Sequence, residues 1–354
     1  MAYTTIDDPS AYFHTQLYTG DGASTRAITN DANAGDFKPD WLWIKQRSQS
    51  SRSHSQWDTS RGASQRLQSD ITGAEETQTN DHKSFDTDGF TVGSGNIVNE
   101  NSQTFVAWQW KANGGTTSSN TDGSVTSTVQ ADTTAGFSIV TYTGTGSGDI
   151  TVGHGLGAVP KVIIGKVRNQ AYSWRVYHAS VGNDKTLVLN LTNAAASSNS
   201  WGNTTPTSSV FTAGRGGDDN MNYGSGDTIV AYCFAEKQGY SKFGSYVGNG
   251  NADGPFIYTG FKPAWIMLKS ATSAEVWSIR DNTRDSFNSA QKAIYADSSG
   301  AESDNVNNSI DLLSNGFKLR NQFGTENTSG GTFIYMAFAE SPFVSSEGAP
   351  TTAR

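Results

Sequence analysis

Tryptophan and arginine lie close together at three places in the chain, and this pairing could bind a ligand. The three phrases are Trp57-Asp58-Thr59-Ser60-Arg61, Trp174-Arg175 and Trp277-Ser278-Ile279-Arg280. An indole ring beside a guanidinium group could stack on a sugar ring and donate hydrogen bonds to it. A core tryptophan with an ion pair at the end of its strand would give the same pattern. Because the pairing recurs with the fold, we favour this second interpretation.

Metal-binding residue types lack the spacing that a site needs. The histidines are scattered, with no pair at i,i+4 and no neighbouring cysteine, so we expect solvated loop residues rather than zinc ligands. They are His14, His54, His82, His154 and His178. Asp86-Thr87-Asp88-Gly89 begins like a calcium loop, but Ile97 stands where a bidentate glutamate is required. A hairpin explains this glycine better, and a single surface calcium ion is the alternative.

Catalytic motifs are not found either. Gly153-His154-Gly155-Leu156-Gly157 lacks the register of a dinucleotide loop and precedes an expected strand, and the chain has no Gly-x-Ser-x-Gly elbow. Paired carboxylates for glycoside cleavage depend on a separation in space that the sequence does not give. The sequence therefore predicts no enzyme, no cofactor and no metal.

The elements that would position these residues recur three times. Each copy opens with Tyr-x-Gly, continues about twenty residues later with a proline and an apolar run, and closes on an aromatic strand. The opening tyrosines are Tyr18, Tyr142 and Tyr246, and the closing strands contain Ala107, Ala231 and Ala337. The spacings of 124 and 106 residues between these alanines are the size of an ordinary domain.

Strand signals dominate within each copy. Asp88-Gly89 and Asn315-Gly316 stand before alternating apolar residues, which predicts β-hairpins. The predicted fold is all-β, with three tandem antiparallel modules of β-sandwich or jelly-roll type. Six side chains are expected in the cores: Trp43, Trp108, Ile163, Tyr232, Ile266 and Phe338.

Composition limits the partners. The net charge of −8 and the pI of about 5.1 disfavour binding to a phosphate backbone, so no nucleic acid is expected. Cys233 is the single cysteine and is predicted to be a buried, inert thiol. The first residues lack the pattern of a secretory signal, and no run is long enough to span a bilayer. The expected protein is soluble and made in the cytoplasm, with no membrane insertion.

Composition shifts suggest the domain boundaries. Residues 1–13 form an N-terminal attachment segment, and residues 14–112 form the first module. Residues 113–134 are rich in Gly, Ser and Thr and are predicted to be a flexible linker. The second and third modules, 135–238 and 239–343, follow each other directly, and 344–354 is a tail.

Several long phrases resemble a family of virion proteins from tailed phages of marine cyanobacteria and other aquatic bacteria. They include Phe37–Lys45, Ser84–Gly93 and Phe105–Lys111, and the opening Asp7–Phe13 is similar too. The resemblance covers nearly the whole chain, but Val159-Pro160-Lys161-Val162 departs from it in the second module. It implies a non-enzymatic virion structural protein, a tail fibre or head appendage, assembled in the host cytoplasm with other virion proteins. It also implies a homotrimer, which small modules with limited cores would favour.

Two other functions stay open: a lectin-like protein that binds host surface glycan, and a capsule polysaccharide depolymerase. Tyr12 and Phe13 are the candidate virion-attachment residues, because they end a short polar lead-in. Trp201 and Tyr223 lie among Gly, Asn and Ser and are the candidate receptor contacts, although Trp201 could equally cap a core. We expect residues 1–13 and the first module to dock on the virion while the other two project outward.

Overall fold

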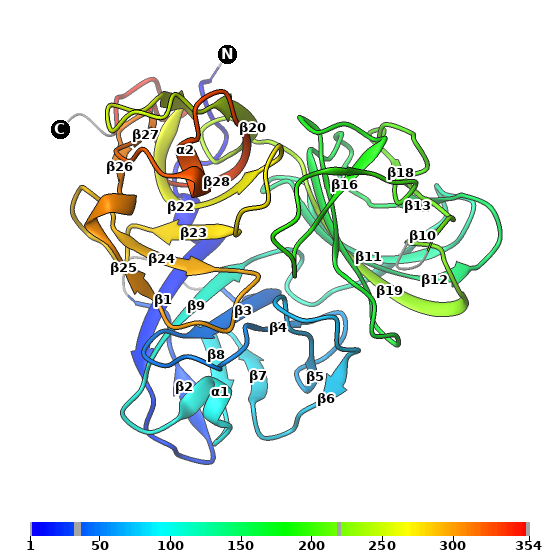
Figure 1. Cartoon of the computed structure of the whole chain (residues 1–354). Helices are drawn as coiled ribbons and strands as arrows, with labels where there is room; N and C mark the ends of the chain where they lie inside the picture. The colour runs from blue at the N-terminus through cyan, green and yellow to red at the C-terminus, as the bar shows by residue number, and fades with distance from the viewer. Residues whose placement is uncertain (1, 32–36, 218–220, 352–354) are drawn as a thin grey trace.

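The computed structural model describes residues 2–31, 37–217 and 221–351 and shows an all-β protein built from antiparallel sheets (Figure 1). The chain forms three successive parts, called here the first segment (residues 13–112), the second segment (113–238) and the third segment (239–343). In each segment a large sheet packs against a small sheet around its own apolar cluster.

The first segment follows a short 3-10 turn. Its elements are η1 Pro9–Ala11, β1 Phe13–Thr19, β2 Arg26–Ile28, β3 Trp41–Gln46, β4 Ser55–Asp58, β5 Gln65–Arg66, β6 Glu76–Thr77, β7 His82–Asp86, β8 Gly89–Val92, α1 Asn96–Asn99 and β9 Thr104–Trp110. The large sheet has the order β1-β9-β3-β4 and the small sheet β2-β8-β7, while β5 pairs with β6. The predicted Asp88-Gly89 hairpin is confirmed, because β7 and β8 pair across this turn.

The second segment has the longest sheet. Its elements are β10 Ser118–Asn120, β11 Ser127–Asp132, β12 Phe137–Thr145, β13 Ile150–Gly153, β14 Val162–Val167, β15 Arg175–His178, β16 Lys185–Val188, β17 Ala196–Ser197, β18 Val210–Ala213 and β19 Ser225–Phe234. The large sheet has the order β10-β11-β12-β19-β14-β15-β16-β17, and β13 pairs with β18.

The third segment follows the second directly. Its elements are β20 Ser241–Val247, β21 Phe256–Tyr258, β22 Phe261–Ser270, β23 Ser278–Asp281, β24 Lys292–Tyr295, β25 Ser303–Asp304, η2 Val306–Asn308, β26 Ile310–Leu313, β27 Gly316–Leu319, α2 Gly324–Asn327 and β28 Thr332–Pro342. The large sheet has the order β20-β28-β22-β23-β24-β25 and the small sheet β21-β27-β26. β26 and β27 confirm the predicted Asn315-Gly316 hairpin.

The opening tyrosine has the same role in every segment. Its hydroxyl donates to a backbone carbonyl in the short helix or loop just before the closing strand, which pairs directly with the opening strand. The three bonds are Tyr18 to Val98 (2.7 Å), Tyr142 to Met221 (2.9 Å) and Tyr246 to Glu326 (2.8 Å). The Tyr-x-Gly phrase therefore recurs because it closes the same loop three times.

The large sheets also share one pairing register. Ala107 lies opposite Ile44 in β3, and Ala231 lies opposite Gly165 in β14. The residue at this position in the third segment is Tyr335, opposite Leu268, rather than the Ala337 that the sequence suggested. A shift of two residues keeps a side chain on the same face of a strand, so the sequence pattern could not reveal it.

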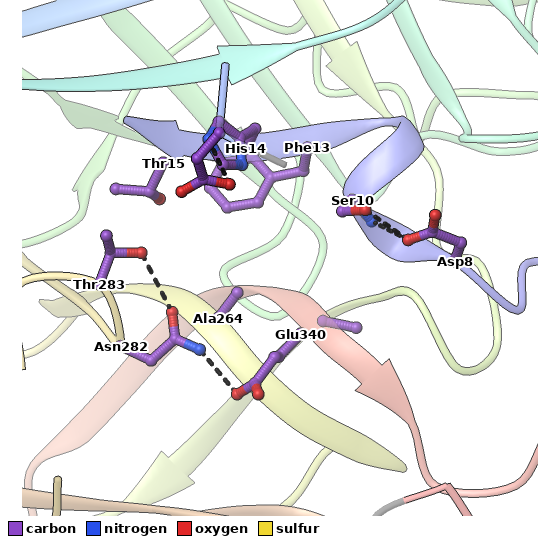
Figure 2. Close-up of a pocket in the computed structure, with 11 residues that line it drawn as sticks. Asp8, Ser10, Phe13, His14, Thr15, Ala264, Asn282, Thr283 and Glu340 are labelled. Atoms are coloured by element: carbon purple, nitrogen blue, oxygen red, sulfur yellow. Dashed lines mark hydrogen bonds and ion pairs between the residues drawn. The ribbon is translucent and has the colours of Figure 1, made fainter. Parts of the chain in front are cut away.

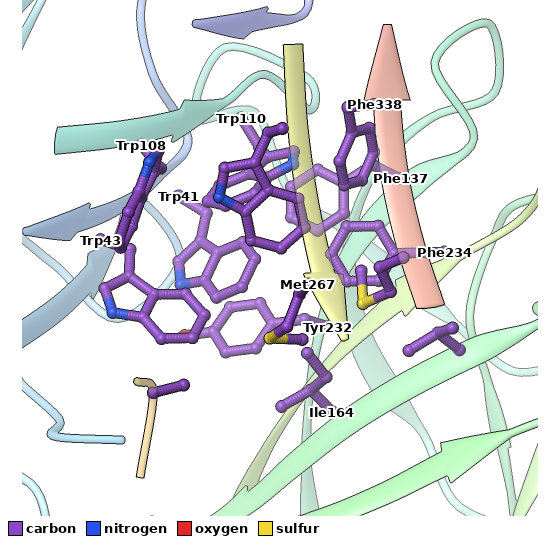
Figure 3. Packing of buried hydrophobic residues seen from close by; sticks show 14 of the residues in the cluster. Trp41, Trp43, Trp108, Trp110, Phe137, Ile164, Tyr232, Phe234, Met267 and Phe338 are labelled. Atoms are coloured by element: carbon purple, nitrogen blue, oxygen red, sulfur yellow. The ribbon is translucent and has the colours of Figure 1, made fainter. Parts of the chain in front are cut away.

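One aromatic cluster is shared by all three segments (Figure 3). The ring contacts that join them are Trp41–Tyr232 (4.3 Å between centroids), Trp110–Trp265 (5.6 Å) and Phe234–Phe338 (5.9 Å). Each large sheet thus buries one face against its own small sheet and the other face against this shared core. The six side chains predicted to lie in cores are all buried, and each burial contributes roughly 1.5–3 kcal/mol.

The predicted linker, residues 113–134, is wrong as a flexible connector. It contains β10 and β11, and β11 pairs with β12 over five residue pairs. Buried Ser127 and Val129 alternate with exposed Thr128, which is strand periodicity built largely from small polar residues. A polar composition hid this strand, because serine and threonine are common both in linkers and in strands.

Candidate functional site

The two candidate attachment residues pack against other parts of the same chain. Phe13 is buried at the start of β1 and stacks on Phe338 of the third segment, with ring centroids 5.3 Å apart. Tyr12 is half-buried and meets Tyr240 edge-on at 5.9 Å. Ile6 is also buried in the shared core. The N-terminal residues therefore hold the first and third segments together, and Phe13 offers no surface for docking.

The two candidate receptor contacts differ in exposure. Trp201 is buried, contacts Tyr177 edge-on at 5.8 Å and donates its indole N–H to the Thr186 hydroxyl at 3.3 Å. It thus lies in the core of the second segment, where a receptor could not reach it, and this corrects the surface placement. Tyr223 is half-exposed and packs edge-on against Tyr172 at 5.8 Å.

Other aromatic side chains are more exposed than these. Phe256 and Tyr258 in β21 expose 44% and 55% of their surface, whereas Ile257 between them is buried. Both aromatic rings therefore point away from the core on one face of the strand. Phe287 is 84% exposed in a loop. The Phe-Ile-Tyr alternation is the signal that could have found this pair.

The tryptophan–arginine phrases are structural. Trp57, Trp174 and Trp277 are all buried, as the favoured interpretation predicted. The arginine of the first phrase, Arg61, forms an ion pair with Asp58 within the turn after β4, and Arg284 pairs with Asp281 in the same way, with 2.6 Å between Nε and Oδ2. No indole of the three phrases is open to a sugar ring.

The phrases are not equivalent to one another in the fold. By strand register, Trp174 and Trp277 correspond to His54 rather than to Trp57. Each of these three side chains bonds to a backbone carbonyl of the preceding segment around the ring. The bonds are Trp174 Nε1 to Gln68 (2.8 Å), Trp277 Nε1 to Val188 (2.9 Å) and His54 Nε2 to Tyr295 (3.0 Å). The three segments therefore form a closed ring.

The prediction that the histidines are solvated is wrong for four of the five. His54, His82, His154 and His178 are buried, and each ring bonds to a backbone carbonyl. Burial lowers the pKa of His82 and of His178 to about 4, so both are neutral at pH 7. Within residues 2–31, 37–217 and 221–351, no three His, Cys, Asp or Glu side chains are placed to hold a metal ion.

Ion pairs cross the junction between the first and second segments. Glu75 accepts two bonds from Arg168 of the second segment (2.6 and 3.0 Å) and one from Arg61 of its own segment (2.8 Å). Burial alone would raise the pKa of Glu75, but these arginines hold it below its usual value. With such contacts the first segment cannot orient independently of the second, as a flexible linker would have allowed.

The other two junctions differ from each other at the positions equivalent to Glu75 and Arg168. Glu302 accepts two bonds from Arg47 of the first segment (2.8 and 2.9 Å) and one from Arg284 (3.1 Å). Between the second and third segments, Ala195 and Ala271 occupy the equivalent places and are joined by a backbone bond of 3.0 Å. At these positions, therefore, two junctions are charged and one is apolar.

A buried lysine holds an equivalent position in each large sheet, directly after Ile44, Gly165 or Leu268. These lysines are Lys45, Lys166 and Lys269. Burial lowers the pKa of Lys45 and of Lys269 to about 8, which could suit an amine nucleophile. However, the ammonium groups donate to backbone carbonyls, Lys269 to those of Thr192 (2.9 Å) and Ser270 (3.1 Å). These lysines tie loops to the sheets and do not face a substrate. Cys233 is buried, as predicted, and burial raises the pKa of its thiol.

A cavity of about 400 Å³ opens at the junction of the first and third segments (Figure 2). One wall is the edge strand β1 with Thr15, and the other is formed by the ends of β22 and β28 and the turn after β23. We call it the β1 notch. Within this second wall Asn282 donates to Glu340 at 2.7 Å, and the Thr283 hydroxyl lies 3.5 Å from the Asn282 oxygen. Its carboxylates are engaged, since Glu340 also pairs with Lys262 at 2.7 Å and Asp8 binds Ser10. A third carboxylate, that of Asp31, lies 3.9 Å from His14 Nε2, so the β1 notch offers hydroxyl, amide and carboxylate groups to a hydrogen-bonding ligand.

The comparisons with known proteins identify a family. Residues 8–342 match a domain described as a domain of unknown function, DUF7483. The chain belongs to the DUF7483 family. Since the match runs from η1 to the end of β28, the DUF7483 unit is the whole ring rather than one of its segments. Neither the curated proteins nor the solved structures gave a match. In the described part of this DUF7483 chain, no helix is long and apolar enough to cross a membrane.

Proposed function

We propose that this protein is a non-enzymatic structural protein of a tailed-phage virion, displayed as a tail fibre or a head appendage. The phrases Phe37–Lys45, Ser84–Gly93 and Phe105–Lys111 support it through their resemblance to such proteins. The observation that carries the proposal is the closed ring. Three segments locked by a shared aromatic core and by ion pairs make one rigid block, which suits a particle component better than an enzyme that must open and close.

The finer architecture belongs to the same proposal. The segments would be three tandem copies of one antiparallel sandwich module, at residues 14–112, 135–238 and 239–343. The repeated tyrosine bonds and the shared register of β3, β14 and β22 support this interpretation. A homotrimer stays part of the proposal on the resemblance alone, because the shared core already supplies the burial that single modules would lack. Light scattering at micromolar concentration tests it, and a stable monomer would refute it.

Detection on particles tests the virion proposal. An antibody raised against the full chain should label purified phage in electron micrographs, and mass spectrometry of the same particles should recover its peptides. Antibody preincubated with the purified protein is the matched control and should abolish the labelling. Presence of the chain in infected-cell lysate but not in purified particles would refute the proposal.

Glycan binding is the second candidate, and the exposed pair in β21 favours it. Phe256 and Tyr258 present two rings on one face, an arrangement that can stack on sugars. On a glycan array Tyr258→Ala should abolish any signal, while Phe287→Ala, which removes a more exposed but isolated ring, should not. Equal signals from both variants would exclude this face. A depolymerase is the third candidate and would release reducing sugars from capsule polysaccharide.

A further inference from the structure

The β1 notch lies beside an unextended sheet edge. In the first segment β1 is the edge strand of its large sheet, and among the described residues no strand pairs with it on the side away from β9. In the second segment the corresponding strand, β12, is not at the edge, because β11 pairs with it on that side. The second segment therefore contains an example of how this edge accepts another strand.

Gln130 shows how the covering strand also fills the junction. It lies opposite Ile139 in the pairing of β11 with β12, and its side chain is fully buried. Its amide nitrogen donates to the hydroxyls of Thr59 (2.8 Å) and Ser60 (3.0 Å), and its oxygen accepts from the backbone N–H of Gly115 (2.7 Å). One amide side chain thus satisfies both sides of the junction.

The β1 notch is the same place at the next junction of the ring. Thr15 pairs with Trp108 in β9, and Ile139 pairs with Tyr232, which holds the equivalent position in β19. Thr15 in the first segment therefore corresponds to Ile139 in the second. Asn282 and Thr283 follow the last residue of β23 as Thr59 and Ser60 follow the last residue of β4. The two polar side chains that receive Gln130 in one junction are therefore matched by two polar side chains in the other.

The third junction closes this edge with a side chain. In β20 the residue at the position of Ile139 and Thr15 is Phe243, and its backbone N–H donates to the carboxylate of Glu236 at 2.8 Å. Two of the three equivalent edges are thus occupied by the chain itself, one by a strand and one by a glutamate.

An unsatisfied polar atom points to a ligand at the remaining edge. Thr15 is only 4% exposed and lines the β1 notch, yet its hydroxyl has no hydrogen-bond partner (Figure 2). A buried hydroxyl without a partner costs free energy that an incoming polar group would recover.

We propose that the β1 edge binds an extended segment of a partner protein, which adds to the sheet as an antiparallel strand and inserts a glutamine or asparagine side chain into the β1 notch. The backbone ladder supplies affinity, and the notch selects the amide. Thr15, Asn282 and Thr283 would bind this amide as Thr59 and Ser60 bind Gln130. The proposal is independent of the virion assignment, because it concerns strand addition to the isolated protein.

The test uses the full chain and a labelled, end-capped peptide with the sequence of residues 125–134, which contains β11. Fluorescence anisotropy should show saturable binding. A peptide in which Gln130 is replaced by alanine should bind about fivefold more weakly or worse, because the hydrogen bonds to the amide are lost. Asn282→Ala in the protein should weaken binding similarly, while Asn307→Ala, an exposed change outside the notch, should not.

Cross-linking locates the bound strand. The register of β11 on β12 places Ala131 opposite Ser138, whose counterpart in β1 is His14. A His14→Cys protein should form a disulfide with a peptide carrying cysteine at the Ala131 position, and much less with cysteine at the Thr128 position. Absence of saturable binding up to about 1 mM, equal binding of the alanine peptide, or equal cross-linking of both cysteine peptides would overturn the proposal. A concentration-dependent dimer that protects His14→Cys from thiol reagents would also overturn it, because a second copy would then be the occupant.

Discussion

Replacing Tyr232 with phenylalanine removes one hydroxyl group from the junction between the first and second segments. This hydroxyl donates to Asp58 at 2.7 Å and accepts from Arg61 at 3.2 Å, and all three side chains are buried. The aromatic side chain would stay in place, because its stacking on Trp41 does not involve the oxygen. The change therefore tests the junction without creating a large cavity.

The magnitude follows from the two partners, which are both charged. Hydrogen bonds to charged groups contribute about 1.5–3 kcal/mol, so Tyr232→Phe should lower the free energy of unfolding by about 2.5 kcal/mol. With an unfolding entropy of about 2.1 cal/mol/K per residue, a loss of this size lowers Tm by about 3 °C for a chain of 354 residues. Tyr246→Phe is the matched control. It removes a hydroxyl that donates to the Glu326 backbone carbonyl within one segment, and it should cost about 1 kcal/mol.

Urea unfolding followed by tryptophan fluorescence, with calorimetry on the same samples, measures both variants. The shared core predicts one cooperative transition, which Tyr232→Phe shifts without splitting. A shift no larger than that of Tyr246→Phe would refute the assignment of Tyr232 to a charged junction. Two separate transitions, with only one of them shifted, would refute the closed ring.

Three further perturbations address other parts of the ring. Glu302→Gln should lower the free energy of unfolding by about 2–3 kcal/mol in urea unfolding at pH 7. Arginine partners hold the pKa of Glu302 down, so this stabilisation is present above the ordinary glutamate pKa and is lost as pH falls through the lower folded value. Between pH 5 and about pH 3 the variant should therefore lose less stability than the wild type. Burial lowers the pKa of Lys269 to about 8, so between pH 8 and about 10.4 the unfolded state holds a proton that the folded state has lost, and stability should rise with pH. Lys269→Met should flatten this rise, measured as the urea midpoint at each pH. An unchanged slope would contradict the burial argument. Deleting residues 1–13 should cost about 3–6 kcal/mol, because Ile6 and Phe13 leave the shared core, and calorimetry showing an unchanged Tm would contradict their placement.

Local features of the fold could be predicted from the sequence. The Asp88-Gly89 and Asn315-Gly316 pairs correctly predicted hairpins, in which two residues, Thr87-Asp88 and Ser314-Asn315, connect the paired strands and the glycine begins the next strand. These signals depend only on neighbouring residues, so one sequence suffices to recognise them.

The contacts between segments could not be predicted, because they depend on register. An alignment of the phrases by their tryptophans matches Trp57 with Trp174, whereas by strand register His54 holds the position that Trp174 has in the second segment. Histidine and tryptophan look unrelated in sequence, yet a ring N–H of each donates one bond to a backbone carbonyl across a junction. The β1 notch was missed for the same reason, since Thr15 and Asn282 lie far apart in the chain and each is an ordinary polar residue.

The apolar junction gives a last test of the ring. Ala195 and Ala271 lie where the first junction has Glu75 and Arg168, so introducing that pair should recreate its bond. Ala195→Glu alone should destabilise the protein by about 1–2 kcal/mol, because a half-buried carboxylate would face an apolar surface. Adding Ala271→Arg should recover about 1 kcal/mol of that loss as a coupling energy in a double-mutant cycle.

The cycle for Glu75→Ala and Arg168→Ala, measured in parallel by urea unfolding, provides the reference, because there the same two positions already hold a bidentate pair. Couplings of the same sign at both junctions would establish that the positions are equivalent around the ring. A coupling of zero between Ala195→Glu and Ala271→Arg, beside a favourable one for the natural pair, would mean that the second and third segments meet in a different geometry from the first and second. The threefold equivalence on which the β1 notch proposal depends would then fail at that junction.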